Sequence, residues 1–126
     1  MVKDYLIIND KKYASLTAIT AEEQALGLMH QKNPPIMIFL SKMEEKKFWM
    51  KNCPVPLDIL FCRNNSIIDI HKGEPNSIKE FGPKQKCNIV IEAPHGFVKK
   101  CGLNLGNKIQ ISLCLETMAK FITNQL

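Results

Sequence analysis

One stretch constrains the fold more than any other: residues 48–61, which read FWMKNCPVPLDILF. It holds Trp49, the chain's single tryptophan, and two of its six phenylalanines. Two strand-like runs, Lys47–Asn52 and Leu57–Cys62, flank the four residues Cys53–Pro56. Because proline fixes its own φ and pushes the preceding residue toward extended conformations, these four residues suit a loop. The pattern predicts an antiparallel hairpin.

A second turn follows at Arg63–Ser66, where two asparagines stand at positions that need a positive φ. Asparagine tolerates that region better than most residues. The next strand is predicted at Ile67–Lys72. In the predicted register Asp58 faces Lys51 on one neighbour and His71 on the other, which makes a cross-strand row of three ionisable groups.

Alternation along these three strands predicts two different faces. The apolar face, expected to meet the core, carries Phe48, Met50, Leu57, Ile59, Phe61, Ile68 and Ile70. The other face is mixed and carries Trp49, Lys51, Asp58, Leu60, Cys62, Ile67, Asp69 and His71. A shift of one residue would bury the charges, so the alternation favours this register.

The candidate binding face consists of Trp49, Lys51, Asp58 and His71. A carboxylate can hold an imidazole in one tautomer, and an indole can stack on a ring or sugar. The favoured interpretation is structural rather than functional: these residues form a cross-strand ion pair on a partly solvated face of the sheet. Asp58 would then pair with Lys51 or accept backbone N–H groups from the loop at Cys53–Val55, because a buried acid without a partner is costly.

The N-terminal part predicts a hairpin from Val2–Ile8 and Lys12–Ile19, joined by a polar turn. Thr20 and Glu23 form a capping box, so a short helix is predicted from Ala21 to about Met29. The residues of this helix expected to face the core are Ala25, Leu28 and Met29.

The middle of the chain predicts a buried strand at Ile36–Leu40 and a polar connection at Ser41–Lys46. Gly73–Lys86 is a long irregular stretch that could fold over the mixed face as a flap. Cys87–Ala93 predicts a strand. Pro94–Cys101 predicts a short helix, with proline near its start and a glycine after its end.

The chain closes with a strand at Ile109–Leu113 and an amphipathic helix. The apolar face of this helix carries Leu115, Met118, Ala119, Ile122 and Leu126. The expected fold is a single α+β, β-rich domain over residues 1–113: a strongly bent antiparallel sheet closing toward a barrel, with two short helices. The C-terminal helix, residues 114–126, packs on this domain or on a partner.

Length and charge narrow the function classes. A chain of 126 residues makes one domain with a real core. The net charge is +5, but Arg63 is the only arginine, and arginine is the preferred residue for phosphate and base contacts. Since the lysines are spread along the chain, a role in nucleic-acid binding is not expected.

Neither the cysteines nor the histidines predict a metal site, and no cofactor is expected. The five cysteines are an odd number without Cys-x-x-Cys spacing, which favours buried free thiols in a reducing compartment. Cys53, beside Pro54, is expected to be exposed but not reactive. His30, His71 and His95 lie on separate elements without ligand spacing.

The N-terminus runs directly into a strand pattern without the apolar core of a signal peptide, and no run reaches transmembrane length. The expected location is the cytoplasm, or a particle assembled there, with no membrane association.

Several segments together resemble the family called domain of unknown function 192. They are Thr20-x-x-Glu23 with Gly27-Leu28-Met29, Phe48-Trp49-Met50-Lys51-Asn52, Pro56-Leu57-Asp58-Ile59-Leu60-Phe61, Ile91-Glu92 with Gly96, and Gly102-Leu103-x-Leu105-Gly106-Asn107-Lys108-Ile109. The resemblance implies a compact β-rich domain with short helices and no established activity. The chain departs from the family's usual residues at His30, Gln31, Cys53, His95 and Asn107. Many members carry an export signal, and the terminal helix lies beyond the family pattern.

These features favour a non-enzymatic binding or interaction module with a protein partner or self-association. An accessory component of a larger assembly, such as a viral particle, fits the added helix and the missing export signal. The alternative is a small-ligand-binding protein or enzyme that uses the face of Trp49, Lys51, Asp58 and His71. A third reading, nucleic-acid binding through lysines, predicts steeply salt-dependent affinity.

Overall fold

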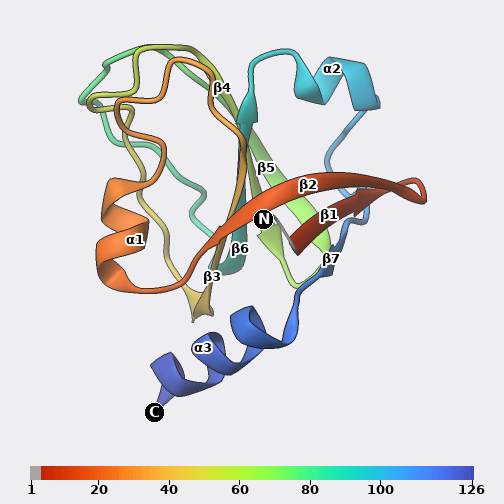
Figure 1. The fold of residues 1–126 in the computed structure, drawn as a ribbon. Coiled ribbons are helices and arrows are strands. Elements are labelled where there is room, and N and C mark those ends of the chain that lie inside the picture. The colour runs from red at the N-terminus through yellow and green to blue at the C-terminus, as the bar shows by residue number, and fades with distance from the viewer. Residues whose placement is uncertain (1–3) are drawn as a thin grey trace.

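The computed structural model describes residues 4–126, and in this part of the chain seven strands form one strongly curled sheet (Figure 1). The strand order is β5-β4-β6-β3-β2-β1-β7. The strands are β1 Asp4–Ile8, β2 Lys11–Ala18, β3 Ile36–Glu44, β4 Leu57–Arg63, β5 Ser66–Gly73, β6 Cys87–Pro94 and β7 Gln110–Ser112. The helices are α1 Ala21–Leu26, α2 Phe97–Cys101 and α3 Leu115–Gln125.

The two edges of the sheet approach each other, as predicted for a sheet closing toward a barrel. The backbone N–H of Ile67 on β5 donates to the carbonyl of Asn107, 3.0 Å away, just before β7. The N–H of Ile109 donates to Asn65 at 2.9 Å. Among the strand pairs of residues 4–126, only β2 and β3 run parallel, because α1 carries the chain across between them.

The sheet has an apolar cluster on each face. The inner cluster, inside the curl, consists of Leu6, Ile8, Ile38, Leu40, Leu60, Cys62, Ile67, Ile89, Ile91, Ala93, Phe97, Leu103 and Ile109. The outer cluster lies under α1 and the long loops and consists of Ala18, Leu28, Phe39, Met50, Cys53, Leu57, Ile59, Phe61, Cys87 and Val90. Every residue of β4 from Leu57 to Cys62 is therefore buried. The predicted mixed, half-wet face was wrong at Leu60, Cys62 and Ile67.

The short-range predictions at the N-terminus are confirmed. β1 and β2 form a hairpin whose turn residues, Asn9 and Asp10, have φ of 50° and 65°; the predicted strand positions 2–3 lie outside the described residues. The capping box of Thr20 and Glu23 is present. α1 ends at Gly27, where φ is 48°, so it is shorter than predicted. Of the three side chains expected in the core, Leu28 is buried and Ala25 is exposed.

The predicted strand Lys47–Asn52 and its hairpin with β4 were wrong. β4 is a central strand whose two edges are occupied by β5 and β6, so no edge remains for a further partner. The segment instead crosses the outer cluster. Phe48 exchanges two backbone hydrogen bonds with Phe81, each of 2.9 Å, and the N–H of Met50 donates to Ser77. The stretch between β5 and β6 thus folds against this segment, rather than over a mixed face.

The predicted row of Lys51, Asp58 and His71 was also wrong. The β4–β5 pairing begins as expected, with Cys62 opposite Ile67, but an irregularity between Phe61 and Cys62 shifts the register. Asp58 consequently faces Lys72, and His71 lies opposite Ile59. A shift of one residue moves a side chain to the other face of the sheet, and Ile70 accordingly packs on the inner cluster.

Gly82 allows a close backbone approach between the loop that precedes β6 and the segment at Lys46. A Cβ built on it would lie 2.0 Å from the carbonyl oxygen of Lys46. Because that atom belongs to the backbone, Gly82→Ala must separate the two segments and break the pairing of Phe48 with Phe81. We expect a loss of about 2 kcal/mol in the free energy of unfolding, measured by urea titration. The control Gln85→Ala, exposed in the same loop, should change little; equal stability of both variants would contradict this packing.

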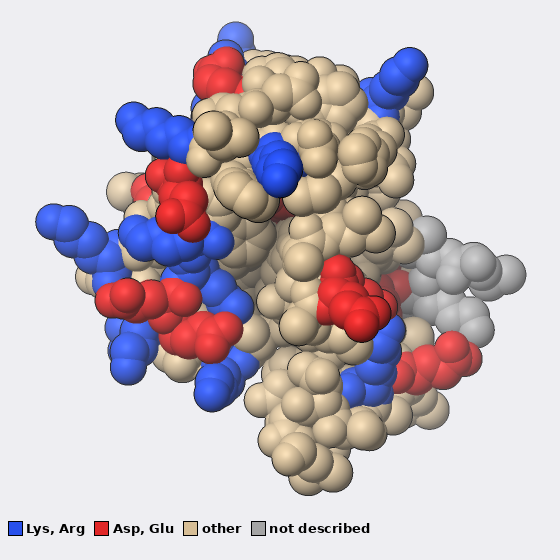
Figure 2. Space-filling view, turned by 90° about the vertical axis from the view of Figure 1, so that its left-hand side faces the viewer, with Lys and Arg blue, Asp and Glu red and all other residues tan. Residues whose placement is uncertain are grey.

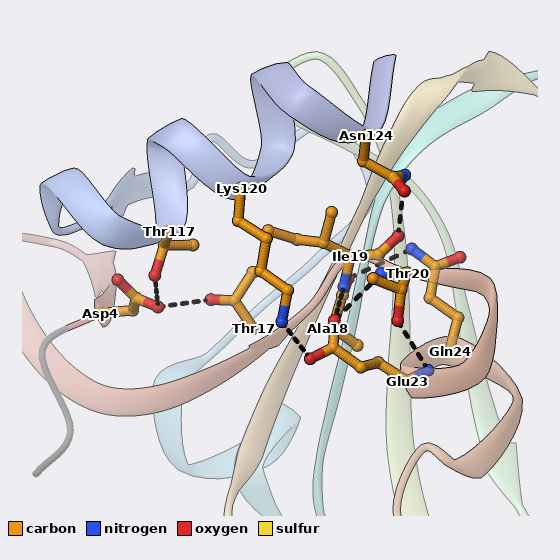
Figure 3. A network of polar contacts seen from close by, with 10 residues as sticks. All are labelled: Asp4, Thr17, Ala18, Ile19, Thr20, Glu23, Gln24, Thr117, Lys120 and Asn124. Atoms are coloured by element: carbon orange, nitrogen blue, oxygen red, sulfur yellow. Dashed lines mark hydrogen bonds and ion pairs between the residues drawn. The ribbon is translucent and has the colours of Figure 1, made fainter. Parts of the chain in front are cut away.

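α3 is attached to the domain largely through polar contacts (Figure 3). The Asp4 carboxylate accepts hydrogen bonds from Thr17 Oγ1 at 2.9 Å, Thr117 Oγ1 at 2.8 Å and the N–H of Cys114 at 2.9 Å. Burial alone would raise the pKa of Asp4, but these donors outweigh it and lower the pKa below its ordinary value. β1, β2 and the start of α3 are thereby joined at one carboxylate.

A second anchor ties the middle of α3 to α1. Lys120 pairs with Glu23, the capping-box residue, and Asn124 Nδ2 donates to the carbonyl of Ile19 at 3.4 Å (Figure 3). Burial would raise the pKa of Glu23, but the Lys120 hydrogen bond and the backbone N–H groups lower it to about 2. Phe121 is half-buried against the inner cluster.

The apolar face predicted for α3 points away from the domain. Leu115 is 80% exposed, Ile122 63% and Leu126 101%, and Met118 and Ala119 are exposed as well. The helix therefore exists as predicted, but it binds its own domain through its more polar side. Among the described residues, none of the helices has the length and apolarity that a membrane crossing requires.

The anchors of α3 should fail in acid. The folded pKa values of Asp4 and Glu23 are both depressed, so their stabilisation is present above about pH 4.5 and is lost as the pH falls. For Glu23 the loss continues through its folded pKa of about 2. We expect pepsin to remove α3 faster at pH 2 than at pH 4. Mass spectrometry measures the cleavage rate, and cleavage of an unfolded substrate corrects for the pH dependence of pepsin itself. An Asp4→Asn, Glu23→Gln double variant should be cleaved readily at both pH values. A wild-type rate independent of pH would contradict these anchors.

Candidate functional site

A pocket of about 210 Å³ opens on the outer face, between α1 and the segment at residues 46–53. The side of the molecule that carries α1 is hollowed, with largely uncharged walls and with lysines and acids on the adjoining surface (Figure 2). The lining residues are Gln24, Ala25, Leu26, Gly27, Leu28, Met29, Phe39, Lys46, Lys47, Phe48, Trp49, Lys51, Cys53 and Glu92. α1 and its C-terminal turn form one wall, and the crossing segment forms the other.

Glu92 is the buried acid of this pocket. It lies on β6 between Met37 of β3 and Ile59 of β4, and alternation directs its side chain to the outer face with Val90. Glu92 is 3% exposed, and no residue of the described chain, 4–126, hydrogen-bonds its carboxyl group. Because no fully buried side-chain oxygen in these residues lacks a partner, the carboxyl oxygens must retain access to the pocket. Burial raises its pKa to about 8.

Gly27 opens the space beside this carboxyl group. A Cβ on Gly27 would lie 3.7 Å from Glu92 Oε1, 3.7 Å from the carbonyl oxygen of Gln24 and 3.5 Å from Cζ of Phe39. Its φ of 48° is also strained for any residue with a side chain. The glycine thus leaves room where two hydrogen-bond acceptors and an aromatic ring converge.

The crossing segment makes the mouth of the pocket basic. Lys51 places its Nζ 5.1 Å from the ring centroid of Trp49, and Trp49 is 42% exposed. Lys46 is buried and pairs with Glu44 at 2.6 Å, whereas neither Lys51 nor Lys47 forms an ion pair within residues 4–126. A ligand therefore meets positive charge at the rim and an acid below it.

Cys53 is buried in the pocket wall, contrary to the predicted exposure. Burial first, and then the charge of Glu92, raises the pKa of its thiol to about 11. A thiol with this pKa stays protonated at neutral pH, and the thiolate is the nucleophilic form. The pocket is therefore poorly suited to covalent catalysis through Cys53.

Asp58 and His71 lie in a second pocket, of about 530 Å³, near α2. Asp58 accepts hydrogen bonds from the N–H groups of Gly96 and Val98, at 3.0 and 2.9 Å, and lies 2.9 Å from Nδ1 of His95. Its predicted role as an acceptor of backbone N–H groups is correct in kind, but the donors belong to the start of α2 rather than to the loop at residues 53–55.

The four residues of the predicted binding face therefore do not form one surface. Trp49 and Lys51 line the first pocket, while Asp58 and His71 line the second. His71 stacks on Phe81 with 3.8 Å between ring centroids. The reason is the crossing path of residues 47–52 together with the shifted register of β5.

Sequence reasoning missed Glu92 and Gly27 as site residues. Their signals were an acid inside an apolar strand and a glycine directly after a capped helix, each ordinary by itself. In residues 4–126 no three or more histidine, cysteine, aspartate or glutamate side chains are grouped to hold a metal ion.

Comparison with known proteins gives a family but no activity. The family model DUF192, described as "Uncharacterized ACR", matches residues 6–111, which leaves α3 outside the match. Among curated proteins the comparison finds no match. Three segments that carry the family resemblance, at Gly27–Met29, Phe48–Lys51 and Glu92, contribute lining residues to the first pocket.

Two crystal structures of similar proteins share the fold. A protein of unknown function from Novosphingobium aromaticivorans DSM 12444 is 26% identical, with a TM-score of 0.75 over 85% of this chain and 82% of that one. A protein from Sinorhizobium meliloti 1021, provisionally described as a transcription regulator, is 25% identical, with a TM-score of 0.78 over 85% of this chain and 90% of that one.

Proposed function

Because this chain belongs to the DUF192 family, whose description names no activity, we propose its function from the pocket: it is a non-enzymatic protein that binds a small molecule above Glu92. The volume of about 210 Å³ lies below the 300–1,000 Å³ typical of pockets for drug-sized ligands. The expected ligand is therefore a small metabolite rather than a polymer or a large cofactor.

One observation carries this proposal: a buried carboxyl group that opens into a pocket and has no hydrogen-bond partner among residues 4–126. Burying a polar group without a hydrogen bond costs about 1–3 kcal/mol, and a charged one costs more. Strongly perturbed acids in clefts are typical of functional sites. A ligand that supplies the missing hydrogen bonds explains why an acid stands here. The protonated Cys53 thiol supports binding over covalent chemistry.

Trp49 provides the test, because the chain has no other tryptophan. Its fluorescence should change when a panel of small metabolites, including sugars, organic acids, amines and amino acids, contains a compound that binds. Ala25→Phe, which fills the mouth, should abolish the response, while Ala21→Phe, exposed on the same helix but outside this pocket, should preserve it. No response to any compound, or equal responses in both variants, would refute the proposal.

A specific observation favours a second candidate function, self-association through α3. The apolar stripe of α3 that includes Leu115, Met118 and Ile122 faces outward, and a two-fold dimer uses the same patch on both copies. A standard interface buries about 800 Å² on each partner, which is more than one face of a short helix offers. The self-association should consequently be weak and dependent on concentration. That the protein is a component of a larger assembly, such as a particle, stays a prediction. The outward-facing surface of α3 would be its contact site there.

Light scattering coupled to size-exclusion chromatography tests this candidate. The full chain should increase in mass with concentration, whereas Ile122→Lys should stay monomeric. Thr123→Lys adds the same charge beside it, on an exposed polar position, and should still associate. A chain ending at Leu113 should be a folded monomer. A full chain that is monomeric at every concentration would remove self-association.

DNA binding has less support, although the Sinorhizobium relative is described as a regulator of transcription. This chain has a single arginine, Arg63, and lysines spread over its length. Anisotropy of a labelled duplex at two salt concentrations would detect the steep salt dependence expected of phosphate contacts.

A further inference from the structure

The first pocket combines a hydrogen-bond-accepting interior with a basic rim. We infer that its ligand is amphoteric: a small molecule whose protonated amine meets Glu92 and whose carboxylate or phosphate meets Lys51. This inference rests on the proposed small-molecule binding and names the chemical class of the ligand.

The interior favours a group that donates several hydrogen bonds. The Glu92 carboxyl oxygen and the Gln24 carbonyl oxygen both lie 3.7 Å from the point where Gly27 lacks a side chain. An ammonium group carries three donors and no acceptor, so one such group can serve both oxygens. The lysines that could compete with a ligand's ammonium group for these oxygens lie on the wall formed by the crossing segment. The wall formed by α1 contributes no charged side chain to the lining.

The rim explains why an amine alone is not the expected ligand. Lys46, Lys47 and Lys51 all line the pocket, and within residues 4–126 only Lys46 forms an ion pair, with Glu44. A ligand that carries only a positive charge would be repelled by these lysines, with no anionic group to offset the repulsion. An anionic group on the same molecule pairs with Lys51, whose Nζ is held over the Trp49 ring. Opposite charges at the two ends of the pocket thus select a molecule with opposite charges at its two ends.

Binding of the amine should displace a proton. With a pKa of about 8, Glu92 is mostly neutral at pH 7. When the ammonium group arrives, the carboxyl proton leaves to the buffer and the amine keeps its own, so roughly 0.9 proton is released per ligand. The other titratable groups in the lining are the three lysines and Cys53, whose pKa of about 11 keeps it protonated. Affinity should consequently rise about tenfold per pH unit from pH 6 toward 8 and then level off.

Isothermal titration calorimetry of the full chain, in two buffers of different ionisation enthalpy, measures both affinity and proton release. The probes are matched in length: 5-aminopentanoate, pentanoate and pentylamine, with the α-amino acids and phosphoethanolamine as further amphoteric compounds. At least one amphoteric probe should bind tenfold or more tightly than pentanoate and pentylamine, with release of nearly one proton at pH 7.

The variants separate the two ends of the ligand. Glu92→Gln should lower the affinity for the amphoteric probe at least tenfold and abolish proton release. Circular dichroism checks that the variant is folded. Lys51→Met should lower this affinity several-fold but leave proton release intact. Lys72→Met, a matched change at the second pocket, should leave both unchanged.

Three outcomes would overturn the amphoteric ligand: pentanoate or pentylamine binding as tightly as every amphoteric probe, no proton release, or no amphoteric compound binding at all. If a neutral sugar binds instead and Ala25→Phe blocks it, the small-molecule function stands while the amphoteric class falls. If nothing in the wider panel binds, the function itself falls.

Discussion

At pH 9, Glu92→Gln is expected to unfold at a higher temperature and a higher denaturant concentration than the wild-type protein. The folded pKa of Glu92 is raised by burial from 4.5 to about 8. Between these values the folded state holds a proton that the unfolded state has lost, so the stability of the wild type falls as the pH rises. The 3.5-unit difference between 8 and 4.5 corresponds to about 5 kcal/mol. Total stabilities are typically 5–15 kcal/mol, so the wild type should be marginal at pH 9.

The comparison between wild type and variant isolates this one group. Urea unfolding at pH 4 should give nearly equal free energies for the two proteins, and the gap should open between pH 4.5 and 8. Glu22→Gln, at an exposed position on α1, should show no gap at any pH. Glu92→Gln destabilised at every pH would mean that the carboxylate has a structural partner. That result would remove the main support for a binding pocket.

A stabilising substitution at a pocket residue has a functional meaning. Stabilising substitutions reduce function where activity depends on a strained or destabilised site. Glu92→Gln should thus raise the free energy of unfolding at alkaline pH while it lowers the affinity for an amphoteric ligand. The two effects have opposite signs, which a purely structural role for Glu92 would not produce.

The sequence predicted the elements that local chemistry determines. The capping box of α1 and the glycine that ends α2 each follow from the preference of one or two residues. Of the two asparagines predicted to have a positive φ between β4 and β5, Asn64 does, at 55°, and Asn65 does not. The β-rich fold class and its barrel-like curl are confirmed as well. These features need no knowledge of what lies on the far side of the sheet.

The predictions were wrong where contacts with distant parts of the chain determine the local structure. Residues 47–52 alternate like a strand, but alternation is equally compatible with a segment that lies across a sheet and buries Met50. The shifted register after Phe61 has no sign in the sequence. Because β4, β6 and β3 are covered on both faces, alternation could not reveal that Glu92 faces a pocket.

The amphipathic pattern of α3 was recognised, but its orientation was not. An apolar stripe is expected to face the core, yet here Thr117, Lys120 and Asn124 bind the domain and the stripe faces outward. The partners of these polar groups lie about a hundred residues earlier in the chain. Such long-range pairs are invisible to periodicity.

Replacing Asp58 should have the second large effect, on the stability of α2. Its carboxylate is 8% exposed and receives the N–H groups of Gly96 and Val98 together with Nδ1 of His95. Asp58→Ala leaves these donors without their acceptor at the start of α2. Loss of a buried charged acceptor and of a helix cap together predicts a decrease of about 3 kcal/mol in the free energy of unfolding, measured by urea titration.

Asp58→Asn distinguishes hydrogen bonding from charge at this position. The amide oxygen can still accept from Gly96 and Val98, while the amide NH₂ must face Nδ1 of His95, which then has to accept a hydrogen bond. The stability loss should shrink to about 1 kcal/mol, and nitrogen-15 NMR should show the His95 proton moving from Nδ1 to Nε2. His95→Ala, at a side chain 48% exposed, should cost less than Asp58→Ala. If Asn and Ala at position 58 cost the same, the negative charge itself holds α2; if neither costs stability, the carboxylate is not its cap.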